Sequence, residues 1–231
     1  ADRAVLFKTG VKEIARKYGI MPTFMAKISE KLPGCSGHLH QSLWRDGKNA
    51  FYDEMTSTKM SEVMESYLAG LLYCLPHVLP MYAPTVNIFK RLVEGAWAPT
   101  TITWAIDNRT VAIRALPGGS KSTRIEMRVV GSDANPYLAH AASLASGLYG
   151  VKNKLKLTVA PSVGNGYADE RNGRLPKVLW SAVQDFKNSE VSKELFGEAF
   201  VKHFAQTRES EWRQFLKTVT DWEYKRYFEI I

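Results

Sequence analysis

Two short stretches of this sequence alternate polar and apolar residues, and this alternation constrains the fold more than any other feature. Side chains two residues apart in an extended strand point to the same face of a sheet. In SGHLHQSLW, residues 36–44, one face therefore carries His38, His40 and Ser42, and the other carries Leu39, Gln41 and Leu43. Two histidines on one face are either a hydrogen-bonded sheet edge or part of a site, so their meaning depends on their partners.

The second stretch, RIEMR at residues 124–128, places Arg124, Glu126 and Arg128 on one face. Alone, this pattern is typical of a surface ion-pair ladder. The loop LPGGSKS is rich in glycine and can approach phosphate closely. Further basic residues lie in the strands and loops around it, namely Arg91, Arg109, Arg114 and Lys121. Imidazole, carboxylate and guanidinium groups without thiolates favour a Mg²⁺ or Mn²⁺ ion bridged to phosphate oxygens.

Helical and strand periods occur along the same chain and predict the α+β class. We expect helices over residues 4–18, over 63–72 with Pro76 ending or kinking the helix, from Asp133 or Asn135 to Gly150, and twice or more after Lys177. Stretches rich in β-branched and aromatic residues predict antiparallel strands within 23–29, 38–44, 101–116 and 122–131. The tryptophans Trp180, Trp212 and Trp222 are expected in the core, and His77, His140 and His203 are expected to have no chemical role.

Composition narrows the function classes. The 231 residues are 45% hydrophobic and carry a net charge of +8, which suits nucleic acid, a membrane surface or a polyanionic ligand such as a nucleotide. No run of about 18 apolar residues predicts a membrane span. Cys35 and Cys74 have no metal-binding spacing, which favours a reducing compartment, and we expect the cytoplasm. The first residue is not Met, so we expect this chain to belong to a longer protein.

Several blocks of the sequence, in order, resemble the glutamine synthetase family. They are SGHLHQSLW, NIFKRLVEG with the following AP, DNRTVAIR, KSTRIEMR, DANPYLAHAA and TDWEYKRYF. The opening LFKTGVKEIARKYG and the loop PGCSGH are most similar to the branch of lengsin-like proteins and γ-glutamyl-amine ligases. The resemblance implies that residues 1–231 are the C-terminal part of the catalytic domain, with a curved antiparallel sheet and flanking helices. The N-terminal β-grasp domain and the upstream acidic metal-ligand segments would be absent.

The resemblance also implies roles for single residues. His38 and Glu126 resemble ligands of one metal ion. His40 and Ser42 resemble nucleotide contacts, and Arg114, Lys121 and Arg124 resemble residues that hold the ATP phosphates. Arg91 and Arg128 resemble anchors of the glutamate carboxylates, Gly34 and Asn87 lie in stretches that line the substrate, and Arg109 resembles the arginine facing the transferred phosphoryl group.

The implied reaction forms γ-glutamyl phosphate from ATP and glutamate, which ammonia or an organic amine then attacks. Trp97 stands where the family has a glutamate that deprotonates ammonium, which questions the use of ammonia. A homo-oligomeric ring is expected for the intact protein, and weak or absent turnover for the chain alone. A catalytically silent lens-type relative is the alternative, and a nucleic-acid binder is the weakest alternative because the basic residues are dispersed.

Overall fold

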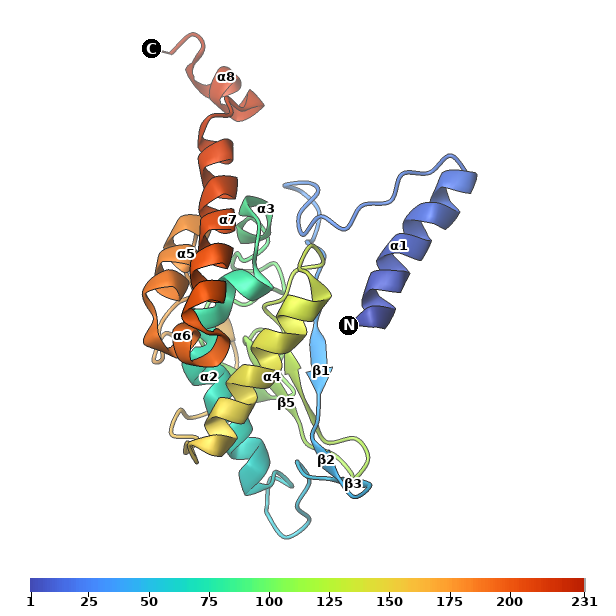
Figure 1. Cartoon of the computed structure of the whole chain (residues 1–231), viewed down its shortest axis with the longest axis vertical. Helices are drawn as coiled ribbons and strands as arrows, with labels where there is room; N and C mark the ends of the chain where they lie inside the picture. The colour runs from blue at the N-terminus through green and yellow to red at the C-terminus, as the bar shows by residue number, and fades with distance from the viewer. Residues whose placement is uncertain (231) are drawn as a thin grey trace.

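The computed structural model describes residues 1–230, and residues 1–127 contain a small mixed sheet and one long helix (Figure 1). Ser61 caps the long helix by accepting a hydrogen bond from the backbone N–H of Met64. The elements up to the end of the sheet are α1 (Asp2–Lys17), β1 (Leu39–Gln41), β2 (Trp44–Arg45), β3 (Lys48–Asn49), α2 (Glu62–Tyr82), α3 (Val86–Phe89), β4 (Trp104–Ile106), β5 (Ile113–Leu116) and β6 (Arg124–Met127).

The second half is helical and packs on the outside of α2 (Figure 1). Asn135 caps the first of these helices, with Pro136 in its first turn, and thereby resolves the choice between Asp133 and Asn135. The elements are α4 (Pro136–Lys152), the 3₁₀ turn η1 (Gly166–Ala168), α5 (Leu179–Asn188), α6 (Glu190–Phe196), α7 (Glu198–Leu216) and α8 (Asp221–Tyr227). Helices and strands together confirm the α+β class.

The four-stranded sheet has the order β1-β6-β5-β4. β6 pairs antiparallel with both β1 and β5, as the sequence predicts, but β4 pairs parallel with β5. The expectation of antiparallel strands throughout 101–116 is therefore wrong. Trp104 pairs with Ile113, so residues 107–112 return the chain to the end of the sheet where β4 begins. Asp107, with a φ of 48°, begins this return in the left-handed conformation.

The strand expected over residues 23–29 does not form. The backbone N–H and C=O of Lys27 bond to the side chain of Asn87 instead of to a neighbouring strand, at 2.8 Å each. The carbonyl of Ala26 accepts from the N–H of Cys35 at 2.8 Å. Both exchanges occupy backbone groups that a sheet ladder would need.

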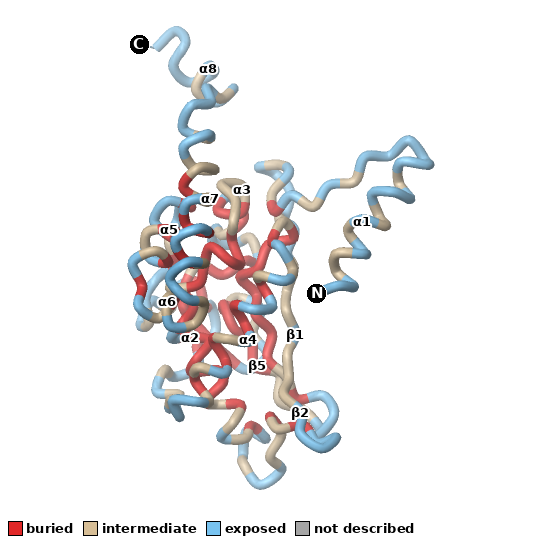
Figure 2. The backbone as a smooth tube through the Cα atoms, in the orientation of Figure 1, coloured by how far each residue is buried: buried red, intermediate tan, exposed pale blue. Residues whose placement is uncertain are grey.

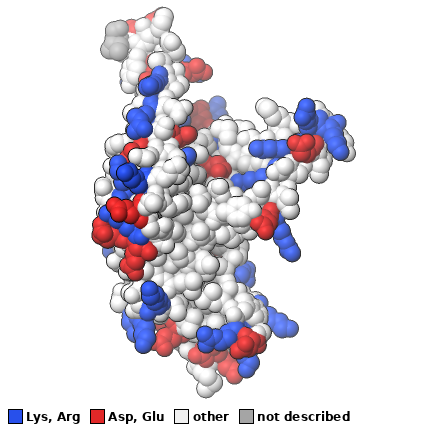
Figure 3. All heavy atoms as spheres, viewed as in Figure 1, with Lys and Arg blue, Asp and Glu red and all other residues white. Residues whose placement is uncertain are grey.

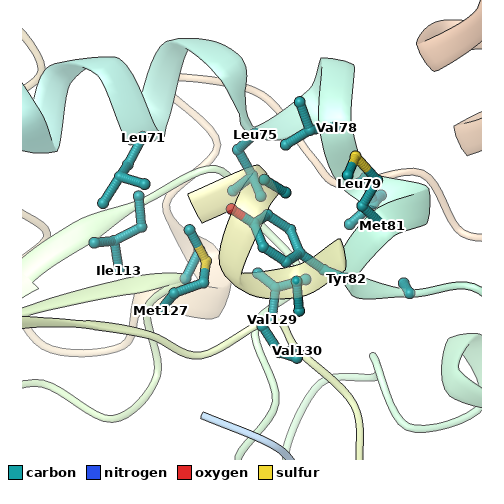
Figure 4. Packing of buried hydrophobic residues seen from close by; sticks show 14 of the residues in the cluster. Leu71, Leu75, Val78, Leu79, Met81, Tyr82, Ile113, Met127, Val129 and Val130 are labelled. Carbon is teal, nitrogen blue, oxygen red and sulfur yellow. The ribbon is translucent and has the colours of Figure 1, made fainter. Parts of the chain in front are cut away.

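Helix α2 supplies the centre of the core and continues through Pro76 and Pro80 to Tyr82, so Pro76 does not end it. Figure 4 shows Leu71, Leu75 and Leu79 of α2 facing residues of the sheet and of the segment after β6. Each proline removes one hydrogen bond from the helix. Burial of a leucine side chain contributes about 1.5–3 kcal/mol, and the many buried side chains of α2 outweigh that loss.

Glycines allow α2 and α4 to pack closely. A Cβ atom added to Gly150 would lie 2.0 Å from the carbonyl oxygen of Ser66, and one added to Gly147 would lie 2.0 Å from Cζ of Tyr67. Gly70 of α2 faces Gly150 in the same way. The short separation fixes α4 against the core, and Asn135 at its start follows closely after β6.

The two end helices stand apart from this body (Figures 1 and 2). Neither α1 nor α8 contains a buried residue. Trp222 on α8 is 62% exposed and Trp180 is 40% exposed, so the expectation that both lie in the core is wrong, whereas Trp212 does pack against the core. Helical spacing shows which residues share a face but not whether another element covers that face. Within residues 1–230, no helix is long and apolar enough to cross a membrane.

Candidate active site

The carboxylate of Glu126 is the centre of a buried cluster of charged groups on the sheet. Ile125 and Met127 point into the core with no exposed surface, so Glu126 points to the opposite face of β6. Its Oε1 lies 2.9 Å from Nδ1 of His38 and accepts a hydrogen bond from Nη1 of Arg128 at 2.9 Å. Its Oε2 accepts from Nη1 of Arg114 at 3.0 Å. We call these four residues (His38, Arg114, Glu126 and Arg128) the Glu126 cluster.

The cluster holds Glu126 in its charged form. Burial of this side chain, which is 4% exposed, raises its pKa. Hydrogen bonds from His38 and Arg114 and the positive charge of Arg128 act in the opposite direction and outweigh burial, so the pKa falls to about 2. Glu126 is therefore a carboxylate at neutral pH and can bind a cation.

β1 brings the histidines to Glu126 through the strand register. His40 is the direct partner of Glu126 across the β1–β6 ladder, and its Nε2 lies 3.9 Å from Oε1 of Glu126. Burial lowers the pKa of His40, and the charge of Arg124 acts in the same direction against the nearby carboxylate. Nε of Arg124 donates to Nδ1 of His40 at 3.2 Å. On the other face of β1, the side-chain amide of Gln41 donates to Ser143 at 2.7 Å, as the alternation predicts.

Arg91 and Gly34 lie next to each other beside the cluster. Arg91 is 2% exposed and donates from Nη1 to the carbonyl of Val129 at 2.9 Å and from Nη2 to that of Arg128 at 3.1 Å. Burial lowers the pKa of Arg91 to about 10. A Cβ atom on Gly34 would lie 2.7 Å from Cγ of Arg91, so only glycine lets this loop approach the arginine. The side-chain oxygen and nitrogen of Asn87 both form hydrogen bonds to the backbone of Lys27.

Arg128 connects the cluster to the segment that carries Trp97. Its Nη2 donates to the carbonyls of Arg109 at 3.0 Å and Trp97 at 3.4 Å. Its Nε is buried and has no hydrogen-bond partner within residues 1–230. An N–H group buried in this way is suited to an anion that enters from outside the protein. The side chain of Trp97 is 63% exposed, and its backbone has a φ of 54°.

The side chains of Arg109, Lys121 and Ser42 make no hydrogen bond to the cluster, although the backbone carbonyl of Arg109 accepts from Arg128. The side chains of Arg109 and Lys121 are exposed and form no salt bridge among the described residues. Ser42 accepts a hydrogen bond from the indole N–H of Trp44 at 2.9 Å. Sequence reasoning missed Asp107, whose carboxylate accepts from Nε of Arg114 at 3.0 Å. In the sequence, Asp107 is recognisable only as an acidic residue in a turn that precedes a strand with a basic residue.

The residues present fit part of a divalent-metal site. Nδ1 of His38 and Oε1 of Glu126 are 2.9 Å apart, a separation that one ion with ligand distances of about 2.0–2.2 Å would span if Nδ1 carried no proton and the ion replaced its hydrogen bond to Glu126. Across residues 1–230, no group of three or more His, Cys, Asp or Glu side chains is placed to hold an ion. Glu209 and Glu211 are two carboxylates separated by one residue, a spacing that could suggest metal ligands. They lie on α7, where Glu209 pairs with Lys187 at 2.8 Å.

A cavity of about 350 Å³ opens beside β1, next to the cluster. Its walls combine the imidazoles of His38 and His40 with the apolar side chains of Phe7 and Phe24. His140 on α4 also lines this cavity, although the sequence gives it no chemical role. Polar and apolar walls in one cavity suit a ligand that carries both kinds of group.

The fold and the Glu126 cluster together define an α+β protein with a buried cluster of charged groups, two of which fit part of a divalent-metal site. The sequence profile described as "Glutamine synthetase, catalytic domain" matches residues 1–227. The chain therefore belongs to the glutamine synthetase family and carries that catalytic domain's sequence pattern over nearly its whole length.

Individual relatives include a glutamine synthetase, a glutamate–isopropylamine ligase and a γ-glutamylethanolamide synthetase. Type-1 glutamine synthetase 2 of Dictyostelium discoideum is 53% identical over 236 residues, which is 100% of this chain and 45% of the relative. The glutamate–isopropylamine ligase of a Pseudomonas species is 41% identical, over 100% of this chain and 51% of the relative. The γ-glutamylethanolamide synthetase of Streptomyces coelicolor is 42% identical, over 99% and 48%. The chain thus spans about half the length of these relatives.

A solved structure of a GmaS/ADP complex has the same fold. It superposes with a TM-score of 0.87 at 32% sequence identity and covers 98% of this chain and 54% of that chain. The likeness bears out the α+β architecture of sheet and flanking helices. It also shows that a protein of this fold binds a nucleotide.

Proposed function

We propose that the protein containing this chain is an ATP-dependent ligase that joins the γ-carboxylate of glutamate to an amine. The observation that carries the proposal is the Glu126 cluster, where Arg114, Arg128 and His38 surround one buried carboxylate. Arg91 and Arg128 are suited to the carboxylates of glutamate because buried guanidinium groups bind carboxylates in a fixed geometry. The unpartnered Nε of Arg128 supports this assignment.

In the first step, a γ-carboxylate oxygen of glutamate attacks the γ-phosphorus of ATP and ADP leaves. Negative charge spreads over the phosphoryl oxygens, and the proposed role of Arg109, Arg114, Lys121 and Arg124 is to stabilise it. His40 and Ser42 are assigned to the nucleotide. A Mg²⁺ or Mn²⁺ ion held by His38 and Glu126 would supply further positive charge at the phosphate.

In the second step, the nitrogen of an amine attacks the acyl carbon, and inorganic phosphate leaves. For this step we propose an organic amine rather than ammonia. Ammonium and organic ammonium ions both lose a proton to solvent or to another base before they attack, and Trp97 offers no carboxylate for either. Its indole, which is 63% exposed, can contact a carbon chain that an organic amine has and ammonium lacks. A cation–π contact to the ring contributes about 0.5–2 kcal/mol. The two relatives whose names refer to isopropylamine and to γ-glutamylethanolamide support an amine acceptor.

The test is phosphate release by the full-length protein with ATP, glutamate and one acceptor from a series that runs from methylamine to polyamines, beside ammonium. We expect an organic amine to be preferred, Trp97→Glu to shift preference toward ammonium, and Trp97→Phe to keep the amine preference. Ammonium preferred by a wide margin with Trp97 intact would end the amine assignment. No turnover with any acceptor would favour the silent lens-type alternative.

We further propose that residues 1–231 are the C-terminal part of the catalytic domain, and that upstream chain supplies the remaining metal ligands. The span of about half of each relative and the two-ligand metal site support this division. Weak or absent turnover is then expected from residues 1–231 alone. A homo-oligomeric ring is proposed for the intact protein. The unpaired Cys35 and Cys74 support a location in the reducing cytoplasm.

A nucleic-acid partner has less support. On the face shown in Figure 3, Lys and Arg side chains are mixed with Asp and Glu around the edges, and the centre of that face is largely uncharged. A nucleic-acid interface instead needs basic side chains gathered into one patch or stripe. Part of the basic excess lies at the Glu126 cluster and beside it, where Arg91, Arg114 and Arg128 are buried.

A further inference from the structure

Arg114 lies between two carboxylates, and only one of them belongs to the Glu126 cluster. Its Nη1 donates to Oε2 of Glu126 at 3.0 Å, whereas its Nε donates to Oδ1 of Asp107 at 3.0 Å. Nη2 of Arg114 bonds to the same oxygen of Asp107. Three of the five N–H groups of a guanidinium are then engaged, and one on each terminal nitrogen is left.

The backbone conformation and hydrogen bonds of its turn fix the position of Asp107. Its φ of 48° lies in the left-handed region, which Asp and Asn tolerate better than other residues with a side chain. Its N–H donates to the carbonyl of Ala115 at 3.0 Å. The next residue, Asn108, donates to the carbonyl of Gly164 at 2.8 Å and accepts from the N–H of Thr110. The turn is therefore tied on two sides.

The ion pair between Asp107 and Arg114 differs from an ordinary surface ion pair because only one partner is exposed. The side chain of Asp107 is 67% exposed, but that of Arg114 is only 11% exposed. Without Asp107, Glu126 would be the only carboxylate bonded to Arg114, and a guanidinium prefers to bind a carboxylate through two parallel hydrogen bonds. Such a rearrangement would turn the remaining N–H groups of Arg114 toward Glu126 and away from an incoming anion.

We propose that Asp107 is a positioning residue for nucleotide binding, which holds Arg114 so that its two free N–H groups remain available to phosphate oxygens. This inference rests on the proposed function, because it takes Arg114 to be a phosphate contact. Asp107 touches neither the nucleotide nor the reacting atoms. Its effect therefore passes through Arg114 and is expected on nucleotide affinity, not on glutamate affinity.

The experiment compares ADP binding by calorimetry in the full-length protein and its Asp107→Asn variant. Asparagine tolerates the left-handed turn, and its amide oxygen can still accept from Arg114, but it lacks the charge of the carboxylate, so the melting temperature should change little. We expect ADP affinity to fall about threefold to tenfold, because hydrogen bonds from Arg114 to an uncharged amide are weaker than those to the Asp107 carboxylate. KM for ATP should rise by a similar factor, with KM for glutamate unchanged. Asp46→Asn is the matched control, since Asp46 has a φ of 50° and no salt bridge among the described residues.

A double-mutant cycle shows whether the effect passes through Arg114. In an Arg114→Lys background, adding Asp107→Asn should change ADP affinity by less than about twofold, because lysine lacks the paired N–H groups that Asp107 holds. Unchanged affinity in Asp107→Asn alone, or an equal loss in both backgrounds, would overturn the inference while wild-type turnover leaves the proposed function standing. A wild-type protein that binds no ADP would overturn the proposed function, and the inference with it.

Discussion

Replacement of Glu126 by glutamine tests whether the buried cluster is held together by charge. The amide nitrogen of glutamine is a hydrogen-bond donor and would lie about 3 Å from another donor in either orientation of the amide. At the position of Oε2 it would face Arg114, and at the position of Oε1 it would face Arg128 and His38. Arg128, which is 3% exposed, would lose its ion-pair partner. The variant keeps the size of the side chain, so any loss of stability reports on charge and hydrogen bonding.

The magnitude follows from the pKa of Glu126. A carboxyl whose pKa falls from 4.5 to about 2 on folding adds about 3 kcal/mol to the stability at neutral pH. Removal of one partner from a buried ion pair costs about 3–5 kcal/mol, which agrees with this value. We therefore expect Glu126→Gln to lower the free energy of unfolding by about 3 kcal/mol at about pH 7.

The sign of the pH dependence is fixed because the pKa is lowered in the folded state. The contribution of Glu126 is fully present above about pH 4.5 and is lost as the pH falls toward 2. The difference between wild type and variant should therefore shrink across this window.

Urea unfolding in buffer with EDTA, followed by tryptophan fluorescence, measures both effects. Glu190→Gln is the control, because Glu190 pairs with Lys193 at 2.7 Å but is 86% exposed, and its loss should cost under about 0.5 kcal/mol. A loss below about 1 kcal/mol for Glu126→Gln, or a difference that is independent of pH, would refute the reasoning.

Two further predictions concern how the site is supported. Gly150→Ala should lower the free energy of unfolding by at least about 2 kcal/mol, because the added Cβ would lie 2.0 Å from the carbonyl oxygen of Ser66; Gly10→Ala on the exposed α1 meets nothing within 4 Å and should not destabilise. Asn87→Ala should cost about 1–3 kcal/mol and speed proteolytic cleavage within residues 20–35, because the amide bonds to Lys27 are lost; cleavage at the wild-type rate would contradict this role.

The part of the site on β1 and β6 could be predicted because strands impose a period of two. Once residues 38–44 and 124–128 are read as strands, His38 and Glu126 must each lie opposite the apolar residues that face the core. The structure places them 2.9 Å apart on the same face. The register itself, with His40 opposite Glu126, is not contained in either stretch alone.

The features that the sequence did not predict depend on long-range pairing. Nothing in residues 101–116 indicates that a short connection returns the chain so that β4 and β5 run parallel, since parallel strands ordinarily need a longer crossover. Asp107 occupies that connection, so its contact with Arg114 could not be expected either. The exposed Trp222 is a third case, because helical spacing identifies a face but not its cover.

Charge balance explains why this site should depend on its ligands. Arg91, Arg114 and Arg128 are all buried, and Glu126 is the buried carboxylate that pairs with Arg114 and Arg128. Positive charges that are close together in a region of low dielectric repel one another strongly. An incoming anion reduces this repulsion and is itself attracted by the arginines. Under the proposed function, binding of glutamate and of a nucleotide phosphate would lower the free energy of the site by the same effect. The exposed Asp107 supplies part of that negative charge when no substrate is bound, while leaving two N–H groups of Arg114 free.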